Sequence, residues 1–131
     1  MSKYDNKAVV RQFITEVLTG QKIALDDKLA APNNVNRGMG DADLAGFKAM
    51  LSGMKSAKAG MDIVIENLIA EGDSVVFRGK INVTLPNGNK VTARGITYYR
   101  LANGKIIEDD PITTPDLMQT LGNLMPPRSD P

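Results

Sequence analysis

The feature that most constrains the fold is a change in hydrophobic period at Gly60. Before this residue, apolar side chains recur every three or four positions, which is the spacing of amphipathic helices. After it, apolar and polar side chains alternate, which is the spacing of strands with one buried face. Helices followed by a meander of strands predict an α+β fold with the helices on one face of a curved sheet.

Two helices are expected before the polar segment that follows residue 32. The first spans about 6–19, because its apolar residues form a broad stripe at helical spacing, and Asp5 is suited to cap it. The second is shorter and spans about 23–29. This second helix is expected to carry Asp26 and Asp27 on its solvent side.

A third helix is expected after the polar run 33–41, which breaks the helical pattern. Asp41 or Asp43 can cap it, because a short acidic side chain before an apolar periodic segment accepts hydrogen bonds from the first turn. Its apolar face comprises Leu44, Phe47, Leu51 and Met54, with Met50 alongside.

The second half of the chain is expected to form four strands joined by tight turns. In the two long central strands every charged side chain has an even number, so the odd-numbered rows should face the helices. A terminal helical turn is expected at 115–124. The strands are expected at 61–69, 74–85, 90–101 and 106–111.

The hairpin at Asn87 and Gly88 must keep the two odd-numbered rows on one face. A plain two-residue turn would pair odd with even positions, so we infer a three-residue loop or a bulge there. Gly79 and Gly95 remove bulk from the inner rows. The sheet should therefore bend at these glycines and leave room for a cavity.

The composition limits the chemistry that the chain can perform. It contains no cysteine and no histidine, which excludes disulfides, thiol catalysis and imidazole bases, so acid–base chemistry must use carboxylates, Tyr or Lys. The net charge is +1 without basic clusters, so neither nucleic acid nor a membrane is an expected partner. No cofactor or metal site is expected. Without a signal-peptide pattern or an apolar stretch of ~18 residues, a cytoplasmic location is expected.

Three successive acids, Glu108, Asp109 and Asp110, end the last expected strand. They are either solvated side chains at a strand end, or one of them enters an apolar pocket as a general acid or base. Side chains alternate between the two faces of a strand, so either the odd-numbered or the even-numbered residues face inward. Burying Glu108 together with Asp110 would place two repelling charges close to each other. We therefore expect Asp109 to face inward, with Asp110 as the alternative catalytic candidate.

The succession RQFITEVLTG, DLAGFKAML, AEGDSVVFRG, GITYYRLANGKIIE and LMQTLG resembles the SnoaL-like polyketide cyclases of the nuclear-transport-factor-2-like superfamily. The resemblance covers roughly residues 6–122. It implies a cone of three helices wrapped by a strongly curved, mostly antiparallel sheet, an apolar pocket between them, and a homodimer. These expectations agree with the fold that the residue pattern predicts.

The resemblance also bears on the site. Members similar to ketosteroid isomerase use a Tyr and two acids. The matching positions here look like Phe13, Arg37 and Thr97, so the resemblance does not imply ketosteroid isomerase activity. SnoaL-like cyclases typically continue GKI.EHWD, whereas this chain reads GKIIEDDP. Asp109 stands at the His position and Pro111 at the position of the usual acid–base Asp. The resemblance leaves Asp109 as the residue that could have taken over this role.

Two functional hypotheses remain. One is a small-molecule enzyme that acts by proton transfer on an apolar, carbonyl-bearing substrate, and the other is a non-catalytic member that binds a ligand or assembles through its sheet. Met39, Met50, Met54 and Met61 are expected mainly in the core. The candidate pocket residues are Phe13, Asn36, Arg37, Phe47, Met50, Met54, Phe77, Thr97 and Tyr99.

The chain is expected to form one domain over 1–125, followed by a disordered tail at 126–131. The outer face of the sheet carries Val76, Ile96 and Tyr98 among charged and amide side chains. This mixture is typical of polar-rimmed interfaces, so a homodimer through the outer sheet face is expected.

Overall fold

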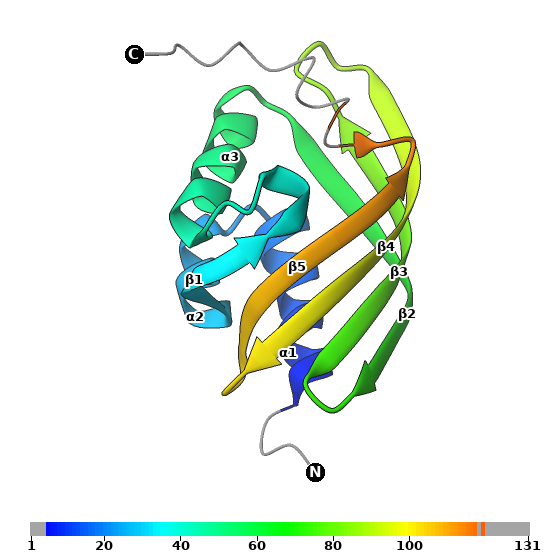
Figure 1. The fold of residues 1–131 in the computed structure, drawn as a ribbon. Coiled ribbons are helices and arrows are strands. Elements are labelled where there is room, and N and C mark those ends of the chain that lie inside the picture. The colour runs from blue at the N-terminus through cyan, green and yellow to red at the C-terminus, as the bar shows by residue number, and fades with distance from the viewer. Residues whose placement is uncertain (1–4, 118, 120–131) are drawn as a thin grey trace.

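The computed structural model describes residues 5–117 and residue 119, and it has the predicted α+β fold. Helices cover one side of a curved five-stranded sheet, as Figure 1 shows. The strand order is β1-β5-β4-β3-β2, in which β1 and β5 are parallel and the other neighbours are antiparallel. The expected tail and most of the expected turn at 115–124 lie outside the described residues.

The first predicted helix is confirmed. It begins as α1 (Asn6–Gln12) and continues without a break as the π-helix η1 (Phe13–Thr19). The Asp5 carboxylate accepts a hydrogen bond from the backbone N–H of Ala8 at 3.1 Å, which satisfies one free donor of the first turn. The stripe that faces the sheet consists of Val10, Phe13, Ile14 and Val17, all buried.

The second helix is a 3₁₀ turn, η2 (Ile23–Leu25), followed by α2 (Asp26–Leu29). Asp27 lies at the surface and binds Lys48 at 2.7 Å, as expected of a solvent-side acid. The prediction for Asp26 is wrong, because only 1% of its surface is exposed. A single helical turn has too few residues for periodicity to define its buried face, so tertiary packing decides which acid turns inward.

The polar segment after α2 forms a strand that the sequence pattern does not predict. β1 (Ala30–Asn36) pairs with β5 alone, so its other edge needs no hydrogen-bonded partner, and it tolerates Pro32 there. A short 3₁₀ turn, η3 (Arg37–Met39), leads to α3 (Leu44–Ser56). Asp43 is the cap that α3 uses, since its carboxylate accepts from the Gly46 N–H at 3.0 Å.

The Asp43 cap offers a test of local stability. Asp43→Ala removes the acceptor of the Gly46 N–H, so we expect a loss of about 1 kcal/mol in the free energy of unfolding, measured by urea denaturation. Asp43→Asn is the matched control, because an amide oxygen at the same position also caps a helix. Equal losses in the two variants would contradict this role for the side-chain oxygen.

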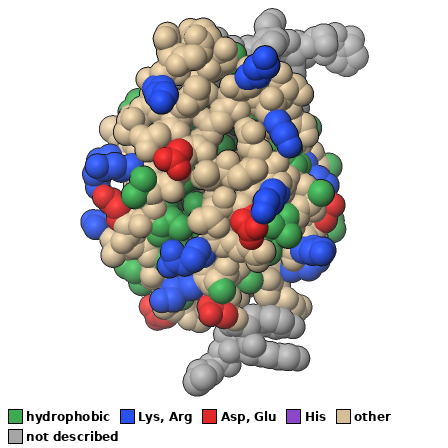
Figure 2. Space-filling model, turned by 180° about the vertical axis from the view of Figure 1, so that it is seen from behind, with side chains coloured by type: hydrophobic (Ala, Val, Ile, Leu, Met, Phe, Trp, Pro, Cys, Tyr) green, Lys and Arg blue, Asp and Glu red, His purple; other side chains and the backbone are tan. Residues whose placement is uncertain are grey.

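The strands after Gly60 form a continuous meander, as predicted. On β3 and β4 the odd-numbered rows are buried and the charged even-numbered rows are exposed, so the predicted face is confirmed. On the face shown in Figure 2, acidic and basic side chains are interspersed. The strands are β2 (Gly60–Glu71), β3 (Ser74–Thr84), β4 (Lys90–Ala102) and β5 (Lys105–Thr114).

The predicted hairpin geometry is also confirmed. Thr84 pairs with Lys90, and the Leu85 N–H donates to the Asn89 carbonyl oxygen at 2.7 Å, which leaves a three-residue loop between them. Gly88 adopts a φ of 88°, a left-handed conformation that favours glycine. The loop keeps odd residues of β3 opposite odd residues of β4, so both inner rows reach the core.

Gly79 and Gly95 are opposite each other on β3 and β4. A β-carbon on Gly79 would overlap the carbonyl oxygen of Val64 and lie 2.8 Å from the Phe77 ring. The pairing of β2 with β3 is irregular at this level, between Ile65 and Asn67. The bare backbone of the glycine pair therefore lets β2 approach closely where the sheet bends.

Candidate functional site

A cavity of about 370 Å³ lies between the helices and the inner face of the sheet. Its wall is mostly apolar and takes side chains from η1, η3, α3 and all five strands of the sheet. Such a wall suits an apolar small molecule held by a few polar groups. The apolar lining includes Ile14, Leu18, Met39, Phe47, Met50, Met61, Ile63, Phe77, Ile81, Pro111 and Leu117.

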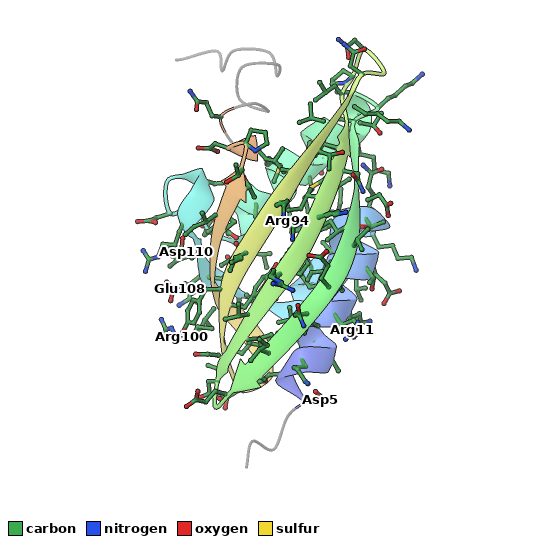
Figure 3. All side chains as sticks on the ribbon, turned by 90° about the vertical axis from the view of Figure 1, so that its right-hand side faces the viewer. Asp5, Arg11, Arg94, Arg100, Glu108 and Asp110 are labelled. Carbon is green, nitrogen blue, oxygen red and sulfur yellow. The ribbon has the colours of Figure 1, made fainter. Side chains whose placement is uncertain are left out.

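Asp109 is half-buried and lines this cavity, whereas Asp110 is exposed. The two residues alternate across β5, so their carboxylates lie on opposite faces of the sheet. Figure 3 looks onto the outer face and shows Asp110 and Glu108 near its edge. Of the three successive acids, the structure brings Asp109 alone into the pocket wall.

Asp109 lies between two polar neighbours in the sheet. Tyr99 of β4 is its partner on one side, and Asn36 of β1 is its partner on the other. Both partners are buried and line the cavity, together with Thr97. The polar end of the pocket is thus assembled from three adjacent strands and is held by main-chain pairing rather than by a loop.

The environment of Asp109 favours its protonated form. Burial, reinforced by the charges of Asp26 and Asp110, raises the pKa of Asp109 to about 7. Burial, followed by the charge of Asp109, raises the pKa of Tyr99 well above its usual range, while a side-chain hydrogen bond with Thr97 opposes that rise. Near neutral pH Asp109 therefore exists in both protonation states, as a proton-transfer group requires.

Asn36 lines the pocket, but its amide nitrogen is used to hold the wall together. It donates to the Asn34 side-chain oxygen at 3.0 Å and to the carbonyl oxygens of Ala42 and Asp43 at 2.9 and 3.4 Å. These bonds tie the end of β1 to the start of α3. The amide thereby fixes the strand that flanks Asp109.

Arg37 does not enter the cavity. Its guanidinium is exposed and bonds the Glu108 carboxylate at 3.1 Å, and Arg100 bonds the other oxygen of the same carboxylate at 3.1 Å. These two hydrogen bonds hold the pKa of Glu108 below its usual range. Arg37 and Glu108 therefore belong to a surface ion-pair cluster at the β1–β5 edge, outside the pocket wall.

Two further candidate pocket residues lie in the core behind the wall. Phe13 packs edge-to-face on Phe47 and on Tyr99, with ring centroids 5.8 and 5.9 Å apart. Met54 is 2% exposed and is also absent from the cavity wall. Phe13 thus supports two lining rings from behind through these edge-to-face contacts.

Several members of the site escape sequence reasoning. Met39 and Met61 line the cavity although the pattern favours the core for them. Pro111 and Thr113 follow Asp109 on the same inner row, and alternation could have identified them once Asp109 was placed. The burial of Asp26 carries no signal in the sequence, since the neighbouring Asp27 has the same side chain.

Within residues 5–117 and 119, no group of three acidic side chains is arranged to hold a metal ion. No helix in the same part of the chain is long and apolar enough to cross a membrane.

The family model of the SnoaL-like domain matches residues 10–109. Among curated proteins, none matches the chain. Solved structures, in contrast, match it over nearly its whole length. A candidate polyketide cyclase from Acidithiobacillus ferrooxidans is 24% identical, with 95% of this chain and 99% of that chain covered and a TM-score of 0.68.

Two further structures give similar agreement. A candidate SnoaL-like polyketide cyclase from Jannaschia sp. CCS1 is 19% identical, with 98% of both chains covered and a TM-score of 0.72. TerC, crystallised with polyporic acid, is 20% identical, with 88% of this chain and 96% of that chain covered and a TM-score of 0.72. These structures share the fold of this chain, and the family model spans most of its sequence. The chain belongs to the SnoaL-like domain family.

Proposed function

We propose that this protein is a small-molecule enzyme of the cyclase or isomerase type, which acts by proton transfer on an apolar, carbonyl-bearing substrate. The observation that carries the proposal is the position of Asp109, which lines an apolar cavity and has a pKa raised to about 7. A carboxyl group in such surroundings can both accept and return a proton near neutral pH. Membership of the SnoaL-like family agrees with this reaction class.

In the proposed chemistry, the Asp109 carboxyl group in the pocket wall carries out the proton transfers. The Asp109 carboxylate takes a proton from the carbon next to a substrate carbonyl, and the C–H electron pair moves to form an enolate. In a cyclisation the enolate carbon then attacks a second carbonyl of the same molecule, and Asp109 returns the proton to the new alkoxide. In an isomerisation the proton returns to another carbon. The apolar wall excludes water from the enolate.

Ligand binding without turnover is the second candidate function. It is favoured by the apolar lining of the cavity and by TerC, a protein of the same fold that was crystallised with polyporic acid. We therefore choose polyporic acid as a first binding probe for the cavity, with quenching of protein tyrosine fluorescence as the measurement. Binding of this probe alone supports either function, so a second experiment must detect the proton transfer.

Hydrogen–deuterium exchange separates the two functions. We expect the protein to accelerate exchange in D₂O at the carbon next to the carbonyl in a panel of apolar ketones, followed by proton NMR. Asp109→Asn should lower the accelerated rate about 100-fold or more, because it removes the acid–base group. Asp110→Asn is the matched control: it removes an adjacent carboxylate on the opposite face of the sheet, whose charge only adds to the raised pKa of Asp109, so it should change the rate far less than Asp109→Asn does.

Two results would argue against proton transfer by Asp109. Accelerated exchange that is equally strong in Asp109→Asn would contradict the role of this residue. Tight binding of polyporic acid by a protein that accelerates no exchange would favour the binding function.

We also propose a homodimer through the outer sheet face. Ile69, Ile96 and Ile112 expose 63, 50 and 73% of their surface there, and Ile96 is paired with Ile112 across β4 and β5.

We expect light scattering to give twice the chain mass of 14.1 kDa at micromolar concentration. Ile96→Glu should reduce this mass to that of one chain, because a charge cannot be buried there without a partner. Thr92→Glu, on the same face nearer the β3–β4 loop, is the control. A monomeric unmodified protein would contradict the proposal.

A further inference from the structure

Asp26 is buried without a partner. Its residue surface is 1% exposed, and neither carboxylate oxygen has a hydrogen-bond partner among the residues that the structure describes. Carboxylates are almost never buried in this way, because the charged form loses its hydration without compensation. A cation is available nearby, but Lys48 bonds the exposed carboxylate of Asp27 at 2.7 Å.

The fold places Asp26 next to the polar end of the pocket. α2, which begins with Asp26, packs against β1, β5 and η1, and these three elements carry Asn36, Asp109 and Ile14 of the cavity wall. The charge of Asp26 acts on both Asp109 and Tyr99. Asp109 and Tyr99 are paired across β5 and β4 in the pocket wall. We call these two residues, together with the buried Asp26 whose charge acts on both, the acidic cluster.

The charged groups around this cluster do not neutralise it. Asp27 repels Asp26 and Lys48 attracts it, and burial outweighs both in raising the pKa of Asp26 to about 6. Burial, followed by the charges of Asp26 and Asp110, raises the pKa of Asp109, and no cation among the described residues opposes this rise. A neutral side chain at position 26 would suit the fold better, because a buried carboxylate without partners destabilises the folded chain.

We propose that Asp26 is a positioning residue that acts through Asp109: its buried carboxylate, which has no hydrogen-bond partner among the described residues, adds to the effect of burial in favouring the protonated form of Asp109. The inference rests on the proposed function, in which Asp109 moves a proton within the pocket. With Asp26 present, Asp109 serves as a proton donor as well as an acceptor. The pocket is then suited to apolar ligands that present an enolate-type or phenolate-type oxygen to the protonated carboxyl.

Carbon-13 NMR of the aspartate carboxyl groups tests the coupling on the full chain without any ligand. Asp26→Asn removes the charge and nearly preserves the shape of the side chain. We expect the titration midpoint of Asp109 to fall from about 7 but to stay above the ~3.9 of a free aspartate, because burial, the largest cause of the shift, is unchanged. Asp27→Asn is the matched control, because it removes the same charge from the adjacent exposed position, and the Asp109 midpoint should stay where it is.

A second neutral variant keeps the test valid if Asp26→Asn does not fold. Asp26→Ala also removes the charge, leaves no polar group in the buried site, and should lower the Asp109 midpoint as well. An Asp109 midpoint that is the same with and without the Asp26 carboxylate overturns the inference. A purely structural Asp26 would change stability and leave the Asp109 midpoint in place.

Comparing the carboxyl titration with the ketone exchange separates this inference from the proposed function. A protein that shows the carboxyl coupling but accelerates no ketone exchange would overturn the proposed function and leave the coupling intact. A protein that accelerates exchange with the same pH dependence in Asp26→Asn as in the unmodified chain would overturn the role of Asp26 alone.

Discussion

Raising the pH from about 5 to 8 is expected to lower the free energy of unfolding by about 3 to 4 kcal/mol. The cause is the pair of carboxyl groups with raised pKa values, about 6 for Asp26 and about 7 for Asp109. In the unfolded chain both release their protons near ~3.9. Between that pH and neutrality the folded state binds more protons than the unfolded state, so each increase in pH favours unfolding.

The sign and the pH window follow from these two values. The stabilisation from the bound protons is complete below ~4, and it is lost as the pH rises through about 6 and then about 7. The share of Asp109 is smaller than its shift alone implies, because this residue is only half-buried beside the cavity. Glu16 and Glu108 have lowered pKa values, so their opposite effect falls at lower pH, outside this window.

Urea denaturation at a series of pH values measures the effect, provided that the slope with denaturant stays constant. The double variant Asp26→Asn, Asp109→Asn is the control and should give a nearly flat profile from pH 5 to 8. It should also be more stable than the unmodified chain at pH 8, since it no longer buries two charges. Stability that rises over this window in the unmodified chain would contradict the burial of the two carboxyls.

Gly79→Ala is expected to lower the free energy of unfolding by about 3 kcal/mol or more. The added β-carbon would overlap the main-chain carbonyl oxygen of Val64, and a strand in a hydrogen-bonded sheet cannot move away without breaking its pairing. The Phe77 ring, 2.8 Å from the same position, closes the other side. Because Phe77 also lines the cavity, the variant should weaken ligand binding as well.

Alanine variants of two further glycines should lose less stability than Gly79→Ala. The β-carbon of Gly95→Ala would lie 2.6 Å from the end of the Ile81 side chain, which can rotate away, so the loss should be smaller. Gly60→Ala meets its nearest neighbour, the Gln21 amide, at 3.7 Å and should be close to neutral. Thermal and urea unfolding of the three variants gives the order, and equal losses at positions 79 and 60 would contradict the close approach of β2.

The sequence by itself determined the elements whose signal is periodic and long. The first helix shows its apolar stripe over several turns, and β3 and β4 alternate for about ten residues each. The charge-free rows of these strands permitted one register, and from that register the three-residue loop at Asn87 and Gly88 could be inferred. The choice of Asp109 over Asp110 rested on the same alternation, together with the repulsion between two buried acids.

Tertiary structure alone decided the short and polar elements. β1 is rich in Asn and contains Pro32, and it is a strand because β5 offers it a free edge to pair with. α2 is a single turn, so its packing, rather than its period, turned Asp26 inward and left Asp27 in solvent. The arrangement of the site depends on both elements: β1 brings Asn36 beside Asp109, and α2 brings a second carboxyl whose charge acts on it. Contacts between residues so distant in the chain leave no periodic trace in the sequence, because they are fixed only when the sheet closes over the helices.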